Sequence, residues 1–396
     1  MSSLAMTTKR FYAFSRSLLR CPSLLGCILL SVSLPLSAGT MRVYFGTYTG
    51  KSSRGIYMSE FDSATGVLKP AELAAESLQP SFLALHPTGK HLFAVNEVSD
   101  FQGKPAGAVT AFRIDAKTGR LTQTQQRSSG GGAPCHLTVD QSGRTLLVAN
   151  YSGGSVASFP IQPDGTLGEM ATFIQHTGKG TDPGRQEAPH AHAIYPDPSN
   201  RFAVVADLGL DRLLVYRLNS ANGTLLAHDA PLASWTPAAG PRHFAFHPNG
   251  RWGYALNEMN STITPVNYNA ARGEFTPRAS VSTLPPDFKG HSGTAEIFVH
   301  PSGRFVYGSN RGHDSIAVFR VNSRNGALTP VQHQSTGGKT PRGFGIDPSG
   351  RWLLAANQDS DTVCVFSIDR KTGLLQPTGQ SIAVGTPVSV HFLARP

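Results

Sequence analysis

The most regular feature of the chain is an alternation of hydrophobic and polar residues that predicts a strand, a tight turn and a second strand. In residues 240–258 the pattern alternates around Phe244 and Phe246, turns at a Pro-Asn-Gly sequence and ends on Asn257 and Glu258. Five further copies follow the same scheme. The turn positions of the six copies are residues 87, 141, 198, 248, 301 and 348, spaced 54, 57, 50, 53 and 47 residues apart.

A second pattern lies between these copies and occurs seven times. It consists of an alternating strand, a glycine turn and a further strand. The seven occurrences begin at Ile56, Val109, Val156, Leu213, Ile263, Ile316 and Val363. Together the two patterns form a unit of four antiparallel strands and about fifty residues, which is typical of a propeller blade. The sequence therefore predicts an all-β fold.

The two ends of the chain supply complementary parts of one unit. Residues 386–393 match a first strand with no turn after it, and residues 42–48 match a second strand with no first strand before it. We predict that the N-terminal strand pairs with the C-terminal strands in one blade. This pairing closes a ring of seven blades and removes the exposed edge of an open array. We therefore expect a single domain over residues 39–396.

Residues 1–38 have a different composition and predict a signal peptide. An apolar run at residues 24–36 is followed by the small residues Ser37 and Ala38. The basic residues before the run are Lys9, Arg10, Arg16 and Arg20. We expect cleavage, a periplasmic or secreted protein and no stable membrane association. A lipoprotein site at Cys27 and an uncleaved anchor are the alternatives.

Composition narrows the possible partners. The chain has 41 glycines, 28 prolines and 15% charged residues, as expected for a β protein rich in turns. Its net charge is +10, and removal of the four basic N-terminal residues leaves +6. The basic residues are scattered and form no cluster with aromatic residues, which argues against a nucleic-acid partner. Cys135 and Cys364 remain after cleavage, so we expect no disulfide framework. We expect a monomer.

The repeat also predicts where a functional site lies. In a propeller blade the first strand is nearest the axis and the second strand returns antiparallel to it. The start of the first strand and the end of the second therefore meet at the same mouth of the ring. The long loops at residues 97–108, 176–188 and 284–293 open at this mouth as well, and loops on a rigid scaffold commonly carry binding sites.

Alignment of the copies on their turn position separates packing positions from diversified ones. The packing position repeats as Leu83, Leu137, Ile194, Phe244, Ile297 and Phe344. The positions expected at the mouth vary: Ser81, Cys135, His192, Arg242, Ala295 and Arg342 stand six residues before the turn, and Phe82, His136, Ala193, His243, Glu296 and Gly343 five before it. After the second strand come Glu97, Tyr151, Leu208, Glu258, Arg311 and Gln358. This contrast predicts a functional mouth.

The residue types at the mouth predict acid–base and anion-binding chemistry. Arg242, Arg311 and Arg342 come from three neighbouring blades and suit a carboxylate or a phosphate. Glu258 and His192 could accept a proton from water or substrate. Glu258 should stay ionised beside guanidinium groups, and an arginine could stabilise the oxyanion of an ester carbonyl.

The candidate residues fall into two sets. We expect His192, Arg242, Glu258 and Arg311 to be catalytic. We expect a second set to bind substrate: His136, His190, His243, Glu296, Arg342 and Glu97. A loop salt bridge is the alternative for Glu97, and a structural ion pair is the alternative for Arg342. The spacing of His190 and His192 could suit a metal, but no cysteine or carboxylate partner is near, so we predict no metal and no cofactor.

Several motifs resemble one known family. They are Pro189-His190-Ala191-His192, Asp207-Leu208-Gly209-Leu210-Asp211-Arg212, Gly240-Pro241-Arg242-His243, Asn257-Glu258 and Ser309-Asn310-Arg311-Gly312. This set is similar to the lactonase family of seven-bladed propellers, which includes propeller-type 6-phosphogluconolactonases and a fungal carboxy-muconate lactonising enzyme. The resemblance covers roughly residues 41–396. It implies a catalytic group of a histidine, an arginine, a glutamate and a second arginine, which would fall on His192, Arg242, Glu258 and Arg311.

Our first functional hypothesis is hydrolysis of a lactone, such as a sugar lactone like 6-phosphogluconolactone, to the open-chain acid. His192 or Glu258 would deprotonate water, Arg242 would polarise the carbonyl or hold the acid product, and Arg311 would bind an anionic substituent. Because the chain is predicted to be exported, another lactone in the periplasm is an equal candidate for its substrate. The alternatives are a muconate-type lactonising cyclase and a non-catalytic envelope propeller that binds a glycan or a protein.

Overall fold

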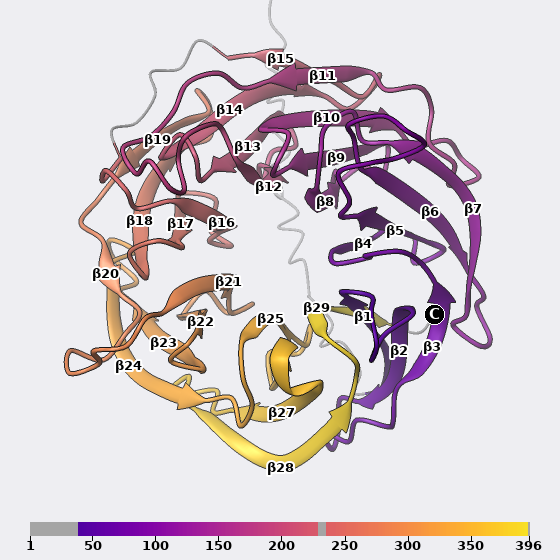
Figure 1. The fold of residues 1–396 in the computed structure, drawn as a ribbon. Coiled ribbons are helices and arrows are strands. Elements are labelled where there is room, and N and C mark those ends of the chain that lie inside the picture. Colours follow the sequence, from indigo (N-terminus) through magenta and orange to yellow (C-terminus); the bar gives the residue numbers. More distant parts are fainter. Residues whose placement is uncertain (1–38, 229–234, 395–396) are drawn as a thin grey trace, which may run out of the picture. The chain divides into compact units, whose positions relative to one another are not determined.

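Seven antiparallel sheets surround a central axis in the computed structural model, which describes residues 39–228 and 235–394 (Figure 1). These residues belong to one compact unit, Ser37–Pro396. The predicted all-β propeller with seven blades of four strands is therefore confirmed. The predicted signal peptide at residues 1–38 lies outside the described residues. Within the described part of the chain, no helix has the length and apolar character that a membrane span requires.

The blades are numbered along the chain, and each is given from its innermost strand outward (Figure 1). Blade 1 comprises β29 (Pro387–Ala394), β1 (Thr40–Thr47), β2 (Gly55–Asp62) and β3 (Glu72–Glu76). Blade 2 comprises β4 (Leu83–Leu85), β5 (His91–Asn96), β6 (Ala108–Ile114) and β7 (Leu121–Ser128). Blade 3 comprises β8 (Pro134–Val139), β9 (Thr145–Asn150), β10 (Ser155–Pro160) and β11 (Thr172–Gln175). Blade 4 comprises β12 (Ala191–Pro196), β13 (Phe202–Asp207), β14 (Arg212–Asn219) and β15 (Thr224–Ala227).

The remaining three blades follow the same order. Blade 5 comprises β16 (Pro241–Phe246), β17 (Trp252–Asn257), β18 (Thr262–Asn269) and β19 (Glu274–Pro277), and a short strand, β20 (Val281–Ser282), also pairs with β18. Blade 6 comprises β21 (Gly293–Val299), β22 (Phe305–Arg311), β23 (Ser315–Val321) and β24 (Leu328–Ser335). Blade 7 comprises β25 (Pro341–Ile346), β26 (Trp352–Asn357), β27 (Thr362–Ile368) and β28 (Leu375–Ala383), with a short 3-10 helix, η1 (Gln358–Ser360), after β26.

The two ends of the propeller meet in blade 1, as predicted. β1 pairs with β29 on one side, where Tyr44 lies opposite His391, and with β2 on the other, where Tyr44 lies opposite Met58. β29 therefore supplies the innermost strand that the N-terminal segment lacks. Because this pairing joins the ends of the array, it stabilises the whole ring rather than one blade.

Several innermost strands carry a β-bulge at the position six residues before the turn, where the residue type varies from blade to blade. In β16, Pro241 lies opposite Asn257 and His243 lies opposite Leu256, so Arg242 is an extra residue with no partner in the register. The corresponding extra residues of β8, β12 and β25 are Cys135, His192 and Arg342. A bulge re-aims the side chain of its extra residue, and here it sets these residues apart from the regular alternation of the strand.

The hydrophobic core lies between neighbouring blades. The packing positions predicted from the repeat are each at most 3% exposed: Leu83, Leu137, Ile194, Phe244, Ile297 and Phe344. Phe244 illustrates the arrangement, since it packs against Val204 of blade 4 and against Val266 and Phe275 of its own blade. Burial of one such side chain stabilises the fold by about 1.5–3 kcal/mol. Both described cysteines, Cys135 and Cys364, are unpaired.

Turn histidines tie successive blades together. Ring nitrogens of His86, His247 and His300 each lie 2.8 Å from a backbone carbonyl in the turn of the next blade, at Gly143, Gly303 and Gly350 respectively. These three histidines are therefore structural.

Candidate active site

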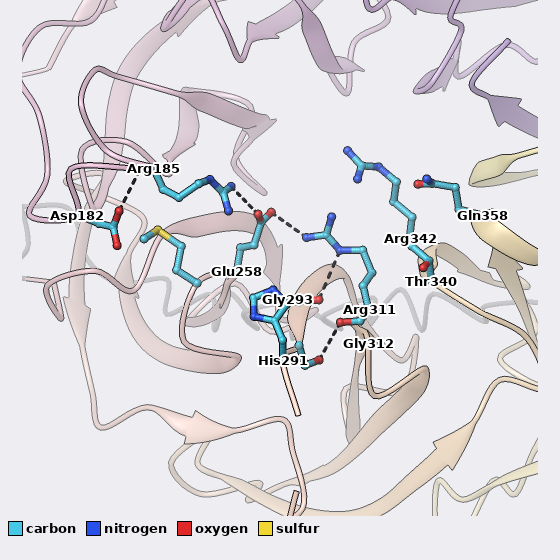
Figure 2. Close-up of a pocket in the computed structure, with 12 residues that line it drawn as sticks. Asp182, Arg185, Glu258, His291, Gly293, Arg311, Gly312, Thr340, Arg342 and Gln358 are labelled. Carbon is cyan, nitrogen blue, oxygen red and sulfur yellow. Dashed lines mark hydrogen bonds and ion pairs between the residues drawn. The ribbon is translucent and has the colours of Figure 1, made fainter. Parts of the chain in front are cut away.

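A cavity of about 560 Å³ opens where blades 5, 6 and 7 meet at the predicted mouth (Figure 2). Its walls include Glu258 after β17, Arg311 at the end of β22 and Arg342 in β25. Two long loops add Arg185 and His291. We call this space the mouth cavity. It is rich in guanidinium groups, which favours anionic or strongly polar ligands.

Glu258 is the centre of the charged network in the mouth cavity. Its Oε2 lies 2.7 Å from Nη1 of Arg242 and 2.9 Å from Nη2 of Arg311. Its Oε1 lies 2.7 Å from Nη2 of Arg185. The glutamate side chain is only 9% exposed, so both of its oxygens are held by guanidinium groups in a largely desolvated place.

Arg242 links Glu258 to His192. Its Nη1 donates hydrogen bonds to Glu258 and to Nε2 of His192, and its Nε donates to the carbonyl oxygen of Ala295 at 2.9 Å. Because Nε2 of His192 accepts, the neutral imidazole carries its proton on Nδ1, which lies 3.7 Å from Sγ of Cys135. The repeated register thus brings all four predicted catalytic residues, His192, Arg242, Glu258 and Arg311, into one cluster.

The cluster has defined charges near neutral pH. Burial acts to raise the pKa of Glu258, but Arg242, Arg311 and Arg185 together outweigh it and hold that pKa well below its ordinary value. Burial and the neighbouring Arg242 hold the pKa of His192 well below its ordinary value. Burial and Arg242 also lower the pKa of Arg311 to about 9. The site therefore contains a carboxylate, a neutral imidazole and charged guanidiniums.

The four predicted catalytic residues lie at two different depths. Glu258 and Arg311 line the mouth cavity, whereas His192 and Arg242 line a smaller cavity of about 20 Å³, which we call the inner cavity. The side chain of Arg242 is 5% exposed and that of Arg311 is 19% exposed. A ligand in the mouth cavity would therefore meet Glu258 and Arg311 directly, with Arg242 and His192 behind them.

Arg342 borders both cavities and has an unusual environment. Its guanidinium carbon lies 5.3 Å from the centre of the Tyr48 ring. No hydrogen bond or ion pair from the described residues engages its guanidinium, so the structural ion pair considered for Arg342 is not formed. Burial opposes the charge of Arg342, but Tyr48, Glu97 and Glu258 outweigh it and raise its pKa. Its five donors are available to a bound anion.

Glu97 and Glu296 lie in the inner cavity rather than the mouth cavity. Glu97 accepts hydrogen bonds from the hydroxyl groups of Tyr48, at 3.0 Å, and Ser81. The loop salt bridge considered for Glu97 is therefore wrong: its partners in the described residues are hydroxyl groups. Glu296 accepts a hydrogen bond from Nδ1 of His243 at 2.7 Å, and both side chains are buried.

His136 and His190, predicted as substrate-binding residues, line neither of these two cavities. Nδ1 of His136 accepts a hydrogen bond from the backbone nitrogen of Ile194 at 3.3 Å. His190 stacks on Tyr151 with 4.6 Å between ring centres, and its Nδ1 donates to the carbonyl oxygen of Tyr151 at 3.1 Å. Both rings thus have packing and hydrogen-bond partners that suffice to explain their burial.

The spacing of His190 and His192 does not produce a chelating pair. His190 faces Tyr151, whereas His192 faces Arg242. Within residues 39–228 and 235–394, no group of three or more histidine, cysteine, aspartate or glutamate side chains is arranged to hold a metal ion.

Sequence comparison of the blades missed Arg185, because this residue lies on a loop with no counterpart in the repeat. The loop itself, at residues 176–188, was expected at the functional mouth. Arg185 also lies 3.3 Å from the hydroxyl group of Tyr151. Figure 2 shows it approaching Glu258 from the side opposite to Arg342.

The fold and the site define a seven-bladed β-propeller with a carboxylate–guanidinium cluster at one mouth. The sequence profile of the family described as "Lactonase, 7-bladed beta-propeller" matches residues 42–392. The chain belongs to this family.

Named relatives and solved structures are consistent with this membership. The chain is 40% identical over 304 residues to a 6-phosphogluconolactonase of Bacillus subtilis, covering 77% of this chain and 84% of the relative. The structure of a periplasmic gluconolactonase of Pseudomonas aeruginosa matches with a TM-score of 0.84 and 33% identity, covering 90% of this chain and all of that one. A putative 6-phosphogluconolactonase of Bacteroides fragilis matches with a TM-score of 0.83 and 32% identity, over 91% of this chain and 99% of that one.

Proposed function

We propose that this protein hydrolyses a sugar lactone to the open-chain acid in the mouth cavity. The observation that carries the proposal is the ionised Glu258 at the cavity wall, flanked by Arg311 and by Arg342, whose guanidinium forms no ion pair with the described residues. Two of the three similar proteins above are named as 6-phosphogluconolactonases and one as a gluconolactonase, which supports the reaction class.

The reaction needs a proton acceptor, an electrophile and a proton donor. Glu258 takes a proton from water as the water oxygen attacks the lactone carbonyl carbon. Arg311 stabilises the negative charge that develops on the carbonyl oxygen. The ring C–O bond then breaks, and the leaving oxygen takes the proton back from Glu258. The products are a carboxylic acid, which ionises, and a hydroxyl group.

Arg242 and His192 act as positioning residues in this scheme. Arg242 lies behind Glu258 and is anchored by the carbonyl oxygen of Ala295, so it orients the carboxylate rather than the substrate. His192 in turn accepts a hydrogen bond from Arg242. We therefore assign carbonyl polarisation to Arg311, instead of to Arg242 as the sequence suggested.

Arg342 is the proposed contact for an anionic substituent, such as the phosphate or carboxylate of a sugar derivative. Its planar fork suits either group. We further propose that residues 1–38 are removed on export and that the protein acts on lactones in the periplasm. The similarity to a periplasmic gluconolactonase supports this location.

The test is hydrolysis of 6-phosphogluconolactone and of neutral glucono-1,5-lactone by the purified protein, followed as base uptake at constant pH with the spontaneous rate subtracted. Glu258→Gln should lower the turnover number roughly 100-fold or more, since general-base catalysis typically contributes 10²–10⁴-fold. The control variant Lys179→Ala removes an exposed cation at a different cavity and should leave the turnover number unchanged. Equal rates for Glu258→Gln and the unaltered protein would refute the assignment.

Two other results would favour a different function. Arg311 and Arg342 line one cavity and could hold the two carboxylates of a muconate-like diacid, so lactonisation of muconates is the second candidate. Loss of muconate absorbance in the ultraviolet without lactone hydrolysis would favour it. Activity on neither substrate class would favour a non-catalytic propeller that binds a glycan or a protein.

A further inference from the structure

Three guanidinium groups hold Glu258, but they are not equivalent. Arg242 and Arg311 also donate to the backbone carbonyl oxygens of Ala295, at 2.9 Å, and Thr294, at 2.8 Å. The side chain of Arg185 is 46% exposed. Exposed ion pairs contribute little to stability, whereas breaking a buried one is costly. Arg185 is therefore the partner that can leave Glu258 most easily.

The backbone that carries Arg185 is held in place. Gln186 is fully buried, and its Nε2 donates to the carbonyl oxygen of Leu208 at 2.8 Å, while its Oε1 accepts from the backbone nitrogens of Thr181 and Asp182. Oδ1 of Asp182 accepts from the backbone nitrogen of Arg185 at 2.9 Å. Release of Glu258 thus needs only a rotation of the Arg185 side chain, without movement of the loop.

Arg185 also lies where the reaction creates charge. Figure 2 shows Arg185 and Arg342 on opposite sides of the Glu258–Arg311 pair, so a lactone that faces this pair lies between them. Hydrolysis converts the neutral ester into a carboxylate next to the carboxylate of Glu258, and like charges this close repel. Arg311 contacts the carbonyl oxygen of the lactone from a fixed position, and Arg242 is held behind Glu258 by the backbone. Arg185 is therefore the cation that can turn to the second oxygen of the new carboxylate.

We propose that Arg185 is a substrate-contacting residue that exchanges partners during the reaction. In the free protein it holds Oε1 of Glu258. With a lactone in the mouth cavity it turns to the lactone carbonyl group, which frees Oε1 of Glu258 to take the proton from water, and it then holds the carboxylate that forms when the ring C–O bond breaks. This inference rests on the proposed lactone hydrolysis. It names Arg185 as the residue through which substrate binding changes the ability of Glu258 to accept a proton.

The exchange resolves a difficulty of the site. A carboxylate held by three guanidiniums accepts a proton poorly, because these charges keep the pKa of Glu258 well below its ordinary value. Departure of one of the three moves that pKa back toward its ordinary value. The carboxylate thus becomes a better base only when a substrate is present.

The kinetic test compares Arg185→Gln, Arg185→Lys and Lys179→Ala with the unaltered protein on glucono-1,5-lactone between pH 4 and 7. Lys179→Ala removes a cation from the same loop at a different cavity and should change nothing. Arg185→Gln should lower the turnover number about 10- to 100-fold, with partial recovery in Arg185→Lys. The kcat/KM of Arg185→Gln, which reports the free protein, should also decline at a higher pH on acidification, because Glu258 has lost a cation there. Loss of activity with an unchanged pH profile would mean a merely structural role and would overturn the inference.

A binding measurement separates this inference from the proposed function. Titration calorimetry with gluconate, the carboxylate product, does not require turnover. Gluconate should bind Arg185→Gln at least 10-fold more weakly than the unaltered protein, and Lys179→Ala should match the latter. That result would support the role of Arg185 even if no lactone were hydrolysed. Equal affinity for the unaltered protein and Arg185→Gln, or no binding to either, would contradict it.

Discussion

Glu258→Gln is also the sharpest test of how the charged cluster is held together. The amide replaces the carboxylate without changing its size, but it leaves the guanidiniums of Arg242, Arg311 and Arg185 without their shared counterion. Removing one partner of a buried ion pair typically costs about 3–5 kcal/mol. Arg185 is half exposed and can turn to water, and the amide oxygen can still accept one hydrogen bond. We therefore expect the free energy of unfolding to fall by about 3 kcal/mol.

Urea denaturation at pH 7 measures this loss, which corresponds to a decrease of roughly 3–5 °C in Tm for a chain of this size. The matched control is Glu169→Gln, whose pair with Arg127 is exposed, with the glutamate side chain 88% accessible. Exposed pairs contribute about 0–1 kcal/mol. A double substitution with Arg242→Met should cost less than the sum of the single ones, because it removes both charges. Equal losses for Glu258→Gln and Glu169→Gln would refute the reasoning.

Two further predictions concern His391, in the innermost strand β29 of blade 1, and the loop that carries Arg185. Burial lowers the pKa of His391 to about 4, and its Nε2 has no hydrogen-bond partner among residues 39–228 and 235–394. Since an unfolded histidine binds its proton near pH 6.5, the free energy of unfolding should fall as pH drops from 6.5 to 4, by up to about 3 kcal/mol from this residue. His391→Phe should flatten that slope in urea titrations at several pH values, and an unchanged slope would disprove the assignment. A methyl group added at Gly209 would lie 1.9 Å from the carbonyl oxygen of Ala188, at the end of the loop that carries Arg185. Gly209→Ala should therefore destabilise the protein by about 1–3 kcal/mol and lower lactone turnover. In Gly250→Ala the added methyl group meets no atom within 4 Å, but φ is +67°, so this control should lose some stability through backbone strain and retain full turnover.

Because the blades repeat, part of the site can be predicted from the sequence. Positions that are equivalent in each blade must lie at equivalent places around the axis, because every blade has the same strand order and the same turn. His192 and Arg242 could therefore be placed at one mouth together with Glu258 and Arg311, although these residues are up to 119 positions apart. The same logic predicted the closure of the ring by β1 and β29.

The repeat could not show how deeply each residue lies or what it contacts. The aligned blades place Arg242 and Arg311 at the same mouth, but a bulge and the carbonyl oxygen of Ala295 hold Arg242 behind Glu258. Glu97 was left open as a salt-bridge residue, and the structure pairs it with the hydroxyl groups of Tyr48 and Ser81. Such differences depend on neighbouring blades, whose contacts are absent from the pattern of any single blade.

The sequence by itself determined the number of blades, their order, the mouth that carries the diversified residues and the positions that form the core. These features follow from strand periodicity and rotational symmetry, which act locally and repeat. Only the tertiary structure decided the burial of Arg242, the position of Arg342 beside the Tyr48 ring and the approach of Arg185 to Glu258. The approach of Arg185 depends on a loop whose path is set by hydrogen bonds of the buried Gln186 amide. Such hydrogen bonds do not repeat from blade to blade, so the sequence pattern does not predict them.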